Sequence, residues 1–468
     1  MKKAELIFVP SPGIGHLVST LEFAKHLTDR DDRISVTILS MKLAVAPWVD
    51  AYTTSLTDSQ PRICVIDLPP VDPPLPDILK KSPEYFISLV VESHLPNVKN
   101  IVSSRSNSGS LQVTGLVLDF FCVSMVDIAK ELSLPSYMFL TSNMGFLRLM
   151  LYLPTRQDRI STVFKSSDDE LLIPGITSPV PVCVMPSCLF NKDGGHATLV
   201  KLAQRFKDVD GIIVNTFHEL EPYAVNAFSG DLNPPLYTVG PVLHLKSQPN
   251  PDLDEAQYQK IFQWLDDLAE SSVVFLCFGS SGSFDVAQVK EIAIGLERSG
   301  YNFLWSLRVS CPKDEASAHR YVTNNGVFPE GFLERIKGRG MICGRVPQVE
   351  ILAHKAIGGF VSHCGWNSIL ESLWYGVPIA TWPIYAEQQL NAFRMVKELG
   401  LALDLRLDYR VGSDLVMAGD IESAVRCLMD GESKIRKKVN EMAEISRKSL
   451  MEGGSSFNSI GQFISLNF

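Results

Sequence analysis

Short apolar runs alternate with helical patterns of hydrophobic residues along most of the chain. In the first half, residues 6–9 and 115–121 form largely apolar runs with the length of strands buried on both faces of a sheet. Further runs of this kind lie at 34–39, 63–68, 135–140 and 211–215. Helical patterns at 85–102 and 124–132 stand between some of them. The alternation predicts a parallel sheet with helices on both of its faces.

The segment 245–254 breaks this rhythm, because it is polar, contains prolines and has no apolar period, so we interpret it as a linker. Beyond it the alternation restarts, and a helical pattern at 433–451 lies near its end. The strands expected in this half lie at 273–278, 303–307, 341–343, 359–362 and 379–381. We therefore predict an α/β protein with two doubly wound parallel sheets, in domains 1–244 and 255–452, that face a common cleft. The last residues, 453–468, are expected to form a helix that packs back on the first domain.

Composition and charge narrow the function classes. The chain has 468 residues, of which 46% are hydrophobic and 20% charged, and its formal net charge is -9. This acidic balance argues against nucleic acid as a partner. No apolar stretch is long enough to span a bilayer, and the first residues lack the apolar core of a secretory signal. Nine scattered cysteines without a C-x-x-C pair suit a reducing compartment, so we expect a cytoplasmic protein.

Two polar residues at predicted strand ends suggest acid–base chemistry. His16 lies in a Pro/Gly turn between the run 6–9 and a helical pattern, and Asp119 ends the run 115–118. Parallel strand ends share one edge of a sheet, so the carboxylate can accept the imidazole N–H, fix its tautomer and stabilise the imidazolium. Alternatively, His16 is a surface or capping residue and Asp119 only caps the next helix. We favour the pair, because both residues end strands of one predicted sheet.

A strand, a tight turn and a helix follow one another around residues 363–368, His-Cys-Gly-Trp-Asn-Ser. Such a turn directs backbone N–H groups and the positive end of a helix dipole at an anion. We expect Asn367 and Ser368 to act as capping residues. A second Gly/Ser turn at 278–282 also follows a predicted strand. These two turns predict a site for phosphate or diphosphate.

Other known site patterns are not supported. Asp252 and Asp254 form a D-x-D sequence, but it lies in the predicted linker, where a solvated turn is the better interpretation. No His/Cys cluster has zinc spacing, and neither the P-loop nor the dinucleotide fingerprint occurs. A nicotinamide oxidoreductase is therefore disfavoured, and no metal ligand is predicted.

Residues 345–388 resemble the signature segment of plant family-1 UDP-sugar glycosyltransferases, the type that acts on secondary metabolites. The resemblance extends along the whole chain, through 10–17, 118–122, 139–143 and 278–280. It is most marked for the subfamily that acts on flavonoids, other phenolics and triterpenoids.

This resemblance implies a GT-B fold and an inverting, metal-independent transfer of glucose from UDP-glucose to a hydroxyl group, giving a β-O-glucoside. UDP-glucose would be a co-substrate, and no cofactor would be needed. His16 would be the general base, and Asp119 would orient it. The implied partners are a UDP-sugar donor and a small hydrophobic acceptor. We also expect a monomer, with no nucleic acid and no integral membrane segment.

The resemblance also implies which residues contact each part of the donor. The residues implied for the diphosphate are Ser280, His363, Asn367 and Ser368. Those implied for the nucleoside are Val346 and Gln348 at the uracil and Glu371 at the ribose. Those implied for the sugar are Trp366, Glu387 and Gln388, with Thr141 near its 6-position.

One position departs from the family, which almost always begins this segment with a Trp that stacks on uracil. Here the residue is Arg345, whose planar guanidinium can also stack on a base. If it turns to solvent instead, nucleotide recognition weakens. The alternative function is therefore a non-catalytic or donor-altered nucleotide-sugar binding protein.

The acceptor would contact apolar side chains of the first half, which suit a flat or bulky aglycone. Each of them is equally suited to the core. The candidates are Phe120, Phe121, Met144, Phe146 and Phe190.

Overall fold

The computed structural model describes residues 4–42, 60–107, 111–160, 162–228, 234–245, 253, 255–280, 282–310, 319–321, 325–410 and 412–468. The chain divides into two compact units. Unit 1 comprises Met1–Val182, Ser187–His244 and Lys448–Phe468, and unit 2 comprises Cys183–Pro186 and Leu245–Arg447. Most of the predicted linker, 246–252 and 254, lies outside the described residues. The predicted cleft between the two sheets stays a prediction.

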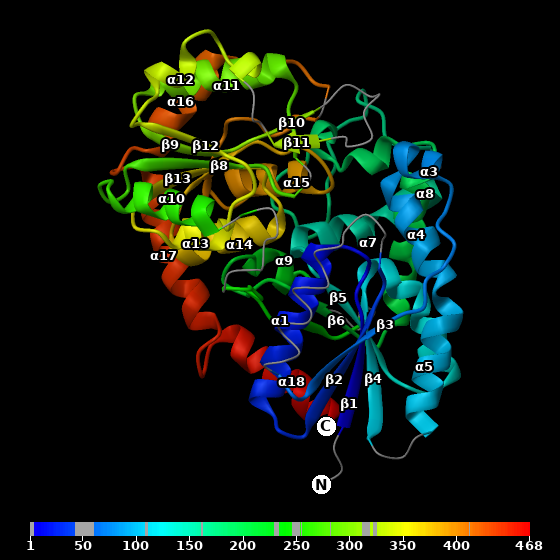
Figure 1. Ribbon diagram of the computed structural model, residues 1–468. Coiled ribbons are helices and arrows are strands. Elements are labelled where there is room, and N and C mark those ends of the chain that lie inside the picture. Colours follow the sequence, from blue (N-terminus) through cyan, green and yellow to red (C-terminus); the bar gives the residue numbers. More distant parts are fainter. Residues whose placement is uncertain are drawn as a thin grey trace. The chain divides into compact units, whose positions relative to one another are not determined.

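Unit 1 contains a sheet whose described strands all run parallel, in the order β3-β2-β1-β4-β5-β6-β7. The chain winds from β1 through β2 to β3, and then continues on the other side of β1 with β4. The boundary between β1 and β4 is therefore the topological switch point of this sheet (Figure 1). The strands are β1 (Ala4–Val9), β2 (Ile34–Ser40), β3 (Ile63–Asp67), β4 (Gln112–Asp119), β5 (Ser136–Leu140), β6 (Gly211–Val214) and β7 (Leu236–Thr238).

Helices alternate with these strands and cover the sheet (Figure 1). The α-helices of unit 1 are α1 (Ile14–Arg30), α3 (Pro76–Lys81), α4 (Pro83–Ser93), α5 (Leu95–Asn107), α6 (Val126–Glu131), α7 (Met144–Arg159), α8 (Gly195–Arg205), α9 (Pro222–Asn226) and α18 (Ser455–Asn467). Short 3-10 turns of unit 1 are η1 (Phe120–Met125), η3 (Ser187–Phe190) and η4 (Phe206–Asp208), and η2 (Val182–Val184) begins at its boundary with unit 2.

Unit 2 repeats the arrangement, with a parallel sheet of order β12-β9-β8-β13-β14-β15. Its switch point lies between β8 and β13. The strands are β8 (Val273–Cys277), β9 (Asn302–Ser306), β12 (Gly340–Cys343), β13 (Ile357–Ser362), β14 (Ile379–Thr381) and β15 (Ala402–Leu403), with a separate antiparallel pair of β10 (Arg308–Ser310) and β11 (His319–Tyr321). The helices are α10 (Glu255–Asp266), α11 (Val286–Ser299), η5 (Asn325–Val327), α12 (Phe332–Arg335), α13 (Gln348–Ala353), α14 (Trp366–Tyr375), α15 (Gln388–Phe393), the π-turn η6 (Arg394–Glu398), α16 (Ala418–Leu428) and α17 (Lys434–Ser449).

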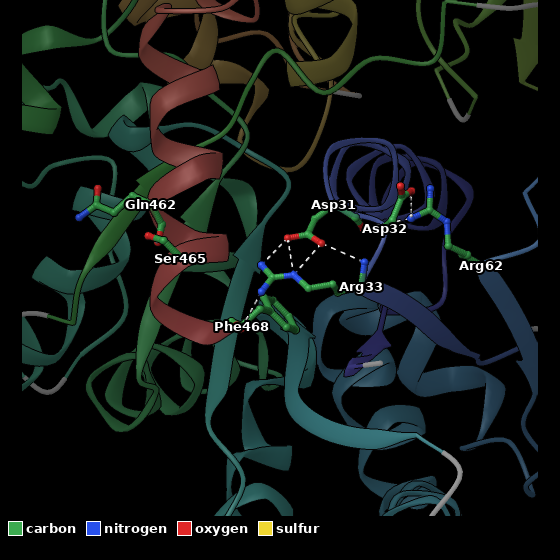
Figure 2. Close-up of polar contacts among 7 residues, drawn as sticks. All are labelled: Asp31, Asp32, Arg33, Arg62, Gln462, Ser465 and Phe468. Carbon is green, nitrogen blue, oxygen red and sulfur yellow. Dashed lines mark hydrogen bonds and ion pairs between the residues drawn. The ribbon is translucent and has the colours of Figure 1, made fainter. Parts of the chain in front are cut away.

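The last helix of the chain, α18, belongs to unit 1 although it follows the helices of unit 2. Phe463 is fully buried, and its ring lies 4.9 Å from that of Tyr137 and 5.3 Å from that of Tyr237. At the far end of α18, the Arg33 guanidinium donates to the Phe468 carbonyl at 3.2 Å and to both carboxylate oxygens of Asp31 (Figure 2). The chain therefore returns to unit 1 after 447, whereas the sequence suggested 452–453.

Some predicted elements have different bounds in the structure. The single helix expected at 85–102 is two helices, α4 and α5, separated at His94. Pro96 supplies the reason, because a proline lacks the N–H that a helix interior needs and is tolerated only in a first turn. The helix expected at 124–132 begins instead as the 3-10 turn η1 and continues as α6. Strand β7 has three residues, too few for an apolar pattern to reveal it.

Candidate active site

The switch point of unit 1 brings His16 and Asp119 together. His16 is the third residue of α1, which follows β1, and Asp119 is the last residue of β4. The two strands are neighbours, and His16 Nδ1 lies 2.8 Å from Asp119 Oδ2. Asp119 is buried, whereas about 29% of the His16 side chain is exposed. The imidazole is thus open to other molecules and the carboxylate is not.

Asp119 also caps the turn that follows it. Its Oδ1 accepts a hydrogen bond from the Phe121 backbone N–H at 3.0 Å, at the start of η1. The two interpretations of Asp119 from the sequence, capping residue and partner of His16, therefore hold at once. Each carboxylate oxygen serves one of them, which fixes the carboxylate in place.

Thr141 directly follows β5, the neighbour of β4 on its other side. Its Oγ1 lies 3.1 Å from Nδ1 of His16. The sequence grouped Thr141 with residues that contact the donor sugar, and nothing local in the sequence indicated its proximity to His16. The strand order β1-β4-β5 supplies that information.

The five apolar candidates for the acceptor site divide into two groups. The Phe120 and Phe121 rings lie 6.0 and 6.3 Å from the His16 ring, and Phe146 on α7 contacts Phe120 edge-on at 5.8 Å. Met144 is fully buried in the core. Phe190 packs against Phe164 in the loop region after α7, with ring centroids 6.3 Å apart. The structure therefore gathers three of the five around His16.

Glu221 is a supporting residue that the sequence analysis missed. Its buried carboxylate accepts from the backbone N–H groups of Met144 at 3.1 Å and Gly145 at 3.2 Å, and from the Thr216 hydroxyl at 2.6 Å. An acidic side chain is favourable at a helix N-terminus, where N–H groups lack partners. Glu221 thereby holds the first turn of α7, which carries Phe146. A separation of 76 residues from Gly145 leaves no local signal for this contact.

At the switch point of unit 2, the turn between β13 and α14 has an unusual backbone. Cys364 has a φ of 62°, a left-handed conformation that costs energy for a residue other than glycine. Its carbonyl accepts from the Asn391 side chain at 3.1 Å, and its N–H donates to Ser362 Oγ at 3.2 Å. These bonds hold the turn in the conformation that starts α14 at Trp366.

One prediction about this turn is wrong. Asn367 and Ser368 are not the N-cap of α14, because that position is occupied by Gly365, which has no side chain. Both residues instead lie in the first turn of the helix. Because glycine has no side chain with which to cap the helix, the N-cap residue itself leaves the first backbone N–H groups of α14 able to bind an anion.

His363 is buried at this turn, between two glycines. A Cβ atom on Gly279, which follows β8, or on Gly365 would lie 2.6 Å from Nε2 of His363. Burial lowers the pKa of His363 to about 4, although the Cys277 backbone opposes this shift. Among the described residues, none forms a hydrogen bond with Nδ1 of His363. The imidazole is therefore neutral at pH 7.

A second polar cluster joins the first residue of α13 to the first two turns of α14. The Gln348 amide nitrogen donates to Ser368 Oγ at 2.8 Å and to Glu371 Oε2 at 2.6 Å. Burial raises the pKa of Glu371 to about 7, and the bond from Gln348 opposes that shift. The structure thus joins three residues predicted to contact the donor, and it makes the charge of one of them sensitive to pH near neutrality.

The remaining residues of unit 2 that were predicted to contact the donor differ in their surroundings. Gln388 is buried, and its Oε1 accepts from the backbone N–H groups of Ile384 at 2.9 Å and Tyr385 at 3.0 Å, so this oxygen holds its own loop. Trp366 is buried and Ser280 is exposed. Arg345 and Val346 lie between β12 and α13, and Glu387 is the N-cap of α15.

In the described part of the chain, no group of three or more His, Cys, Asp or Glu residues has an arrangement that could hold a metal ion. Asp252 and Asp254, the D-x-D pair, lie outside the described residues. No described helix has the length and apolar character needed to span a membrane.

Two doubly wound parallel sheets, each with polar side chains collected at its switch point, define an α/β enzyme of the GT-B fold. Residues 242–450 match the family model described as UDP-glucoronosyl and UDP-glucosyl transferase. The chain is 55% identical to UDP-glycosyltransferase 71K1 of Malus domestica, with 99% of this chain and 98% of that relative covered. It belongs to the plant UDP-glycosyltransferase family and is a UDP-glycosyltransferase.

Further relatives and solved structures agree. The chain is 52% identical to Flavonol 3-O-glucosyltransferase UGT71C4 of Arabidopsis thaliana, over 99% of this chain and 98% of the relative. The structure of Medicago truncatula UGT71G1 complexed with UDP-glucose matches with a TM-score of 0.92 and 54% identity, over 99% and 98% of the two chains. Phytolacca americana UGT2 complexed with UDP-2fluoro-glucose and pterostilbene matches with a TM-score of 0.85 and 32% identity, over 99% of each chain. A non-catalytic binding protein is not favoured by these relationships.

Proposed function

We propose that this enzyme transfers glucose from UDP-glucose to a hydroxyl group of a small hydrophobic plant metabolite, with inversion at the anomeric carbon and without a metal ion. The observation that carries the proposal is the 2.8 Å contact between His16 and the buried Asp119. A histidine held by a buried carboxylate is a suitable general base for a hydroxyl group.

In the proposed reaction, the Nδ1–H of His16 donates a hydrogen bond to Asp119, so Nε2 carries the basic lone pair. Nε2 removes the proton of the acceptor hydroxyl as its oxygen attacks the anomeric carbon of the sugar. The bond from that carbon to the UDP oxygen breaks on the opposite face, and its electron pair leaves with UDP. The α-linked donor thereby gives a β-glucoside, and Asp119 stabilises the imidazolium that forms.

For the donor, we propose that the diphosphate is held by the N-terminus of α14 together with Ser280, His363, Asn367 and Ser368. The backbone N–H groups and dipole of this helix favour an anion, and its N-cap residue, Gly365, has no side chain that could cap it. His363 would act as a neutral hydrogen-bond donor, because its pKa of about 4 leaves it uncharged. These donors would take the place of a metal ion at the leaving group.

The rest of the donor would be held as the family resemblance implies. Gln348 and Val346 would contact the uracil, Glu371 the ribose hydroxyls, and Trp366, Glu387 and Gln388 the glucose. Arg345 would stack on the uracil in place of the usual Trp.

For the acceptor, we propose a flat or bulky aglycone of the flavonoid, phenolic or triterpenoid classes. Phe120, Phe121 and Phe146 around His16 support this choice, because aromatic rings offer apolar surface beside the base. A relative named for flavonol and a structure bound to pterostilbene point to the same chemistry.

The test is UDP release by the full-length enzyme with UDP-glucose and a panel containing a flavonol, a stilbene and a triterpenoid. At least one acceptor should be turned over, with EDTA making no difference and NMR showing a β-glucoside. His16→Ala should lower kcat by about 10²–10⁴-fold. Near-full activity of His16→Ala would remove the base assignment, and an α-linked product would contradict inversion.

A further inference from the structure

Three neighbouring strands of unit 1 each bring one polar side chain to the same imidazole nitrogen. His16 follows β1, Asp119 ends β4 and Thr141 follows β5. Since these strands lie in the order β1-β4-β5, the three side chains meet at one edge of the sheet. His16 Nδ1 is 2.8 Å from Asp119 Oδ2 and 3.1 Å from Thr141 Oγ1.

The Asp119 carboxylate determines which imidazole nitrogen of His16 carries a hydrogen. An ionised Asp119 can only accept, so a contact of 2.8 Å requires that Nδ1 of His16 carry a hydrogen. The Thr141 hydroxyl then faces an N–H group and must present a lone pair to it. Its own hydrogen therefore points away from Nδ1. Thr141 is thus a second acceptor for the same N–H, in a three-centre hydrogen bond.

We infer that Thr141 is a positioning residue for His16, which shares the Nδ1 proton with Asp119 and fixes the plane of the imidazole so that Nε2 keeps one direction. The inference rests on the proposed role of His16 as general base. It differs from the role that the family resemblance implies, a contact near the 6-position of the donor sugar. Two oxygens from different strands restrict rotation of the ring about its Cβ–Cγ bond more than the carboxylate does alone.

The restricted conformation of the Thr141 side chain supports this role. Threonine is branched at Cβ, so its hydroxyl has few orientations, and the residue is anchored at the end of β5. The Phe120 and Phe121 rings limit ring movement further, at 6.0 and 6.3 Å between centroids. The backbone therefore determines where Oγ1 lies relative to His16.

Because the proton lies on Nδ1 of His16, loss of Thr141 Oγ1 should shift the pH dependence of activity in one direction. Thr141 Oγ1 stabilises the imidazolium, because a positively charged ring donates more strongly through Nδ1–H. Without this oxygen, the neutral ring that acts as base persists to lower pH and is also a weaker base. In Thr141→Val, the acid limb of the kcat/KM profile should move to lower pH by about half a unit, and kcat on the plateau should fall about 3–10-fold.

The experiment measures kcat, KM and pH profiles of the full-length enzyme with UDP-glucose and the best acceptor of the panel. Thr141→Ser keeps the hydroxyl and should restore most of kcat and the position of the acid limb. Thr114→Val, on β4 with its hydroxyl bonded to the Glu5 carbonyl at 3.2 Å, is the matched control for the same substitution away from His16. Thermal unfolding of each variant shows whether it is folded.

A second donor separates the positioning role from a sugar contact. UDP-xylose lacks the 6-hydroxymethyl group, so a role confined to that group predicts that Thr141→Val has no effect with UDP-xylose. The positioning role predicts the same loss of kcat with both donors and little change in the KM of UDP-glucose. A raised KM for UDP-glucose with an unshifted acid limb would overturn the inference. If His16→Ala itself kept near-full activity, the proposed role of His16 as general base would fail first, whatever Thr141→Val does.

Discussion

Each of the two switch points of this enzyme positions a histidine, but they differ in how far hydrogen bonds from the protein hold that side chain. In unit 1, His16 is tied to a buried carboxylate at 2.8 Å and to a hydroxyl at 3.1 Å, both supplied by the protein. In unit 2, burial instead holds the pKa of His363 near 4 and raises that of Glu371 to about 7. For the roles proposed above, a base needs an orientation set by the protein, whereas groups that hold a charged donor need hydrogen-bonding capacity left over for it.

The largest effect on activity should come from breaking the pair of His16 and Asp119 in unit 1. Asp119→Asn replaces the carboxylate with an amide that cannot stabilise an imidazolium and can leave His16 in the wrong tautomer. We expect kcat to fall about 10²–10⁴-fold, while the KM for UDP-glucose changes little.

Asp67→Asn is the control for this substitution. Asp67 also ends a strand of the same sheet, β3, but its carboxylate lies 2.7 Å from Lys42 and about 53% of its side chain is exposed. A kcat for Asp119→Asn within a few-fold of wild type would show that the buried carboxylate is dispensable.

In unit 2, the close approach of Gly279 to His363 can be tested by adding one methyl group. Gly279→Ala places a Cβ 2.6 Å from the imidazole, at a backbone φ of +74°. The ring must move, and a His363 that contacts the diphosphate would then be misplaced. We expect the KM for UDP-glucose to rise about 10–100-fold, because a hydrogen bond to a charged group contributes roughly 1.5–3 kcal/mol.

Gly300→Ala is the control that separates the effect of the contact with His363 from the effect of backbone strain. Gly300 has a φ of +80°, and a Cβ added there meets nothing within 4 Å among the described residues. The control should lose stability of about 1 kcal/mol with an unchanged KM. Equal KM values for the two variants would mean that the packing of Gly279 on His363 does not affect donor binding.

Glu371 should show a conflict between stability and donor binding. Its folded pKa is about 7 and its ordinary value is 4.5, so its ionisation disfavours the folded state progressively as pH rises from about 4.5 to about 7. The full shift corresponds to about 3 kcal/mol, and partial exposure to water makes the real cost smaller. Glu371→Gln should therefore unfold at a higher temperature than wild type at pH 8, but not at pH 4.5.

The same variant should bind UDP about 10-fold more weakly at pH 8, because an amide accepts from ribose hydroxyls less well than a carboxylate. Calorimetric titration with UDP measures this, and the affinity of the wild-type enzyme should also fall as pH drops below about 7. An unchanged UDP affinity would separate Glu371 from the donor site.

The smallest expected effect concerns Arg345. Arg345→Trp restores the aromatic ring that the family carries at this position, and we expect the KM for UDP-glucose to fall about 3–5-fold from better stacking on uracil. Steady-state kinetics with varied UDP-glucose measure the change. An unchanged KM would show that this position does not limit donor binding.

Much of this protein follows from local sequence pattern. Apolar runs and helical periods determined two α/β units, because burial on both sheet faces requires continuous apolar strands. Polar residues just after such runs, His16 and Asp119 in unit 1 and residues 363–368 in unit 2, identified the candidate site. The split of α4 from α5 was also readable from Pro96, although the helical period concealed it.

Tertiary structure decided which of these polar groups meet and what their surroundings do to them. Thr141 lies beside His16 because β5 follows β4 in the sheet, and Glu221 holds α7 from a position 76 residues away from Gly145. The pKa values of His363 and Glu371 depend on burial by packed elements that no local pattern encodes. Sequence pattern determines which residues end strands, because that depends on near neighbours. Strand order and burial depend on contacts between distant segments, so only the folded chain adds Thr141 to Asp119, the partner of His16 that the sequence predicted.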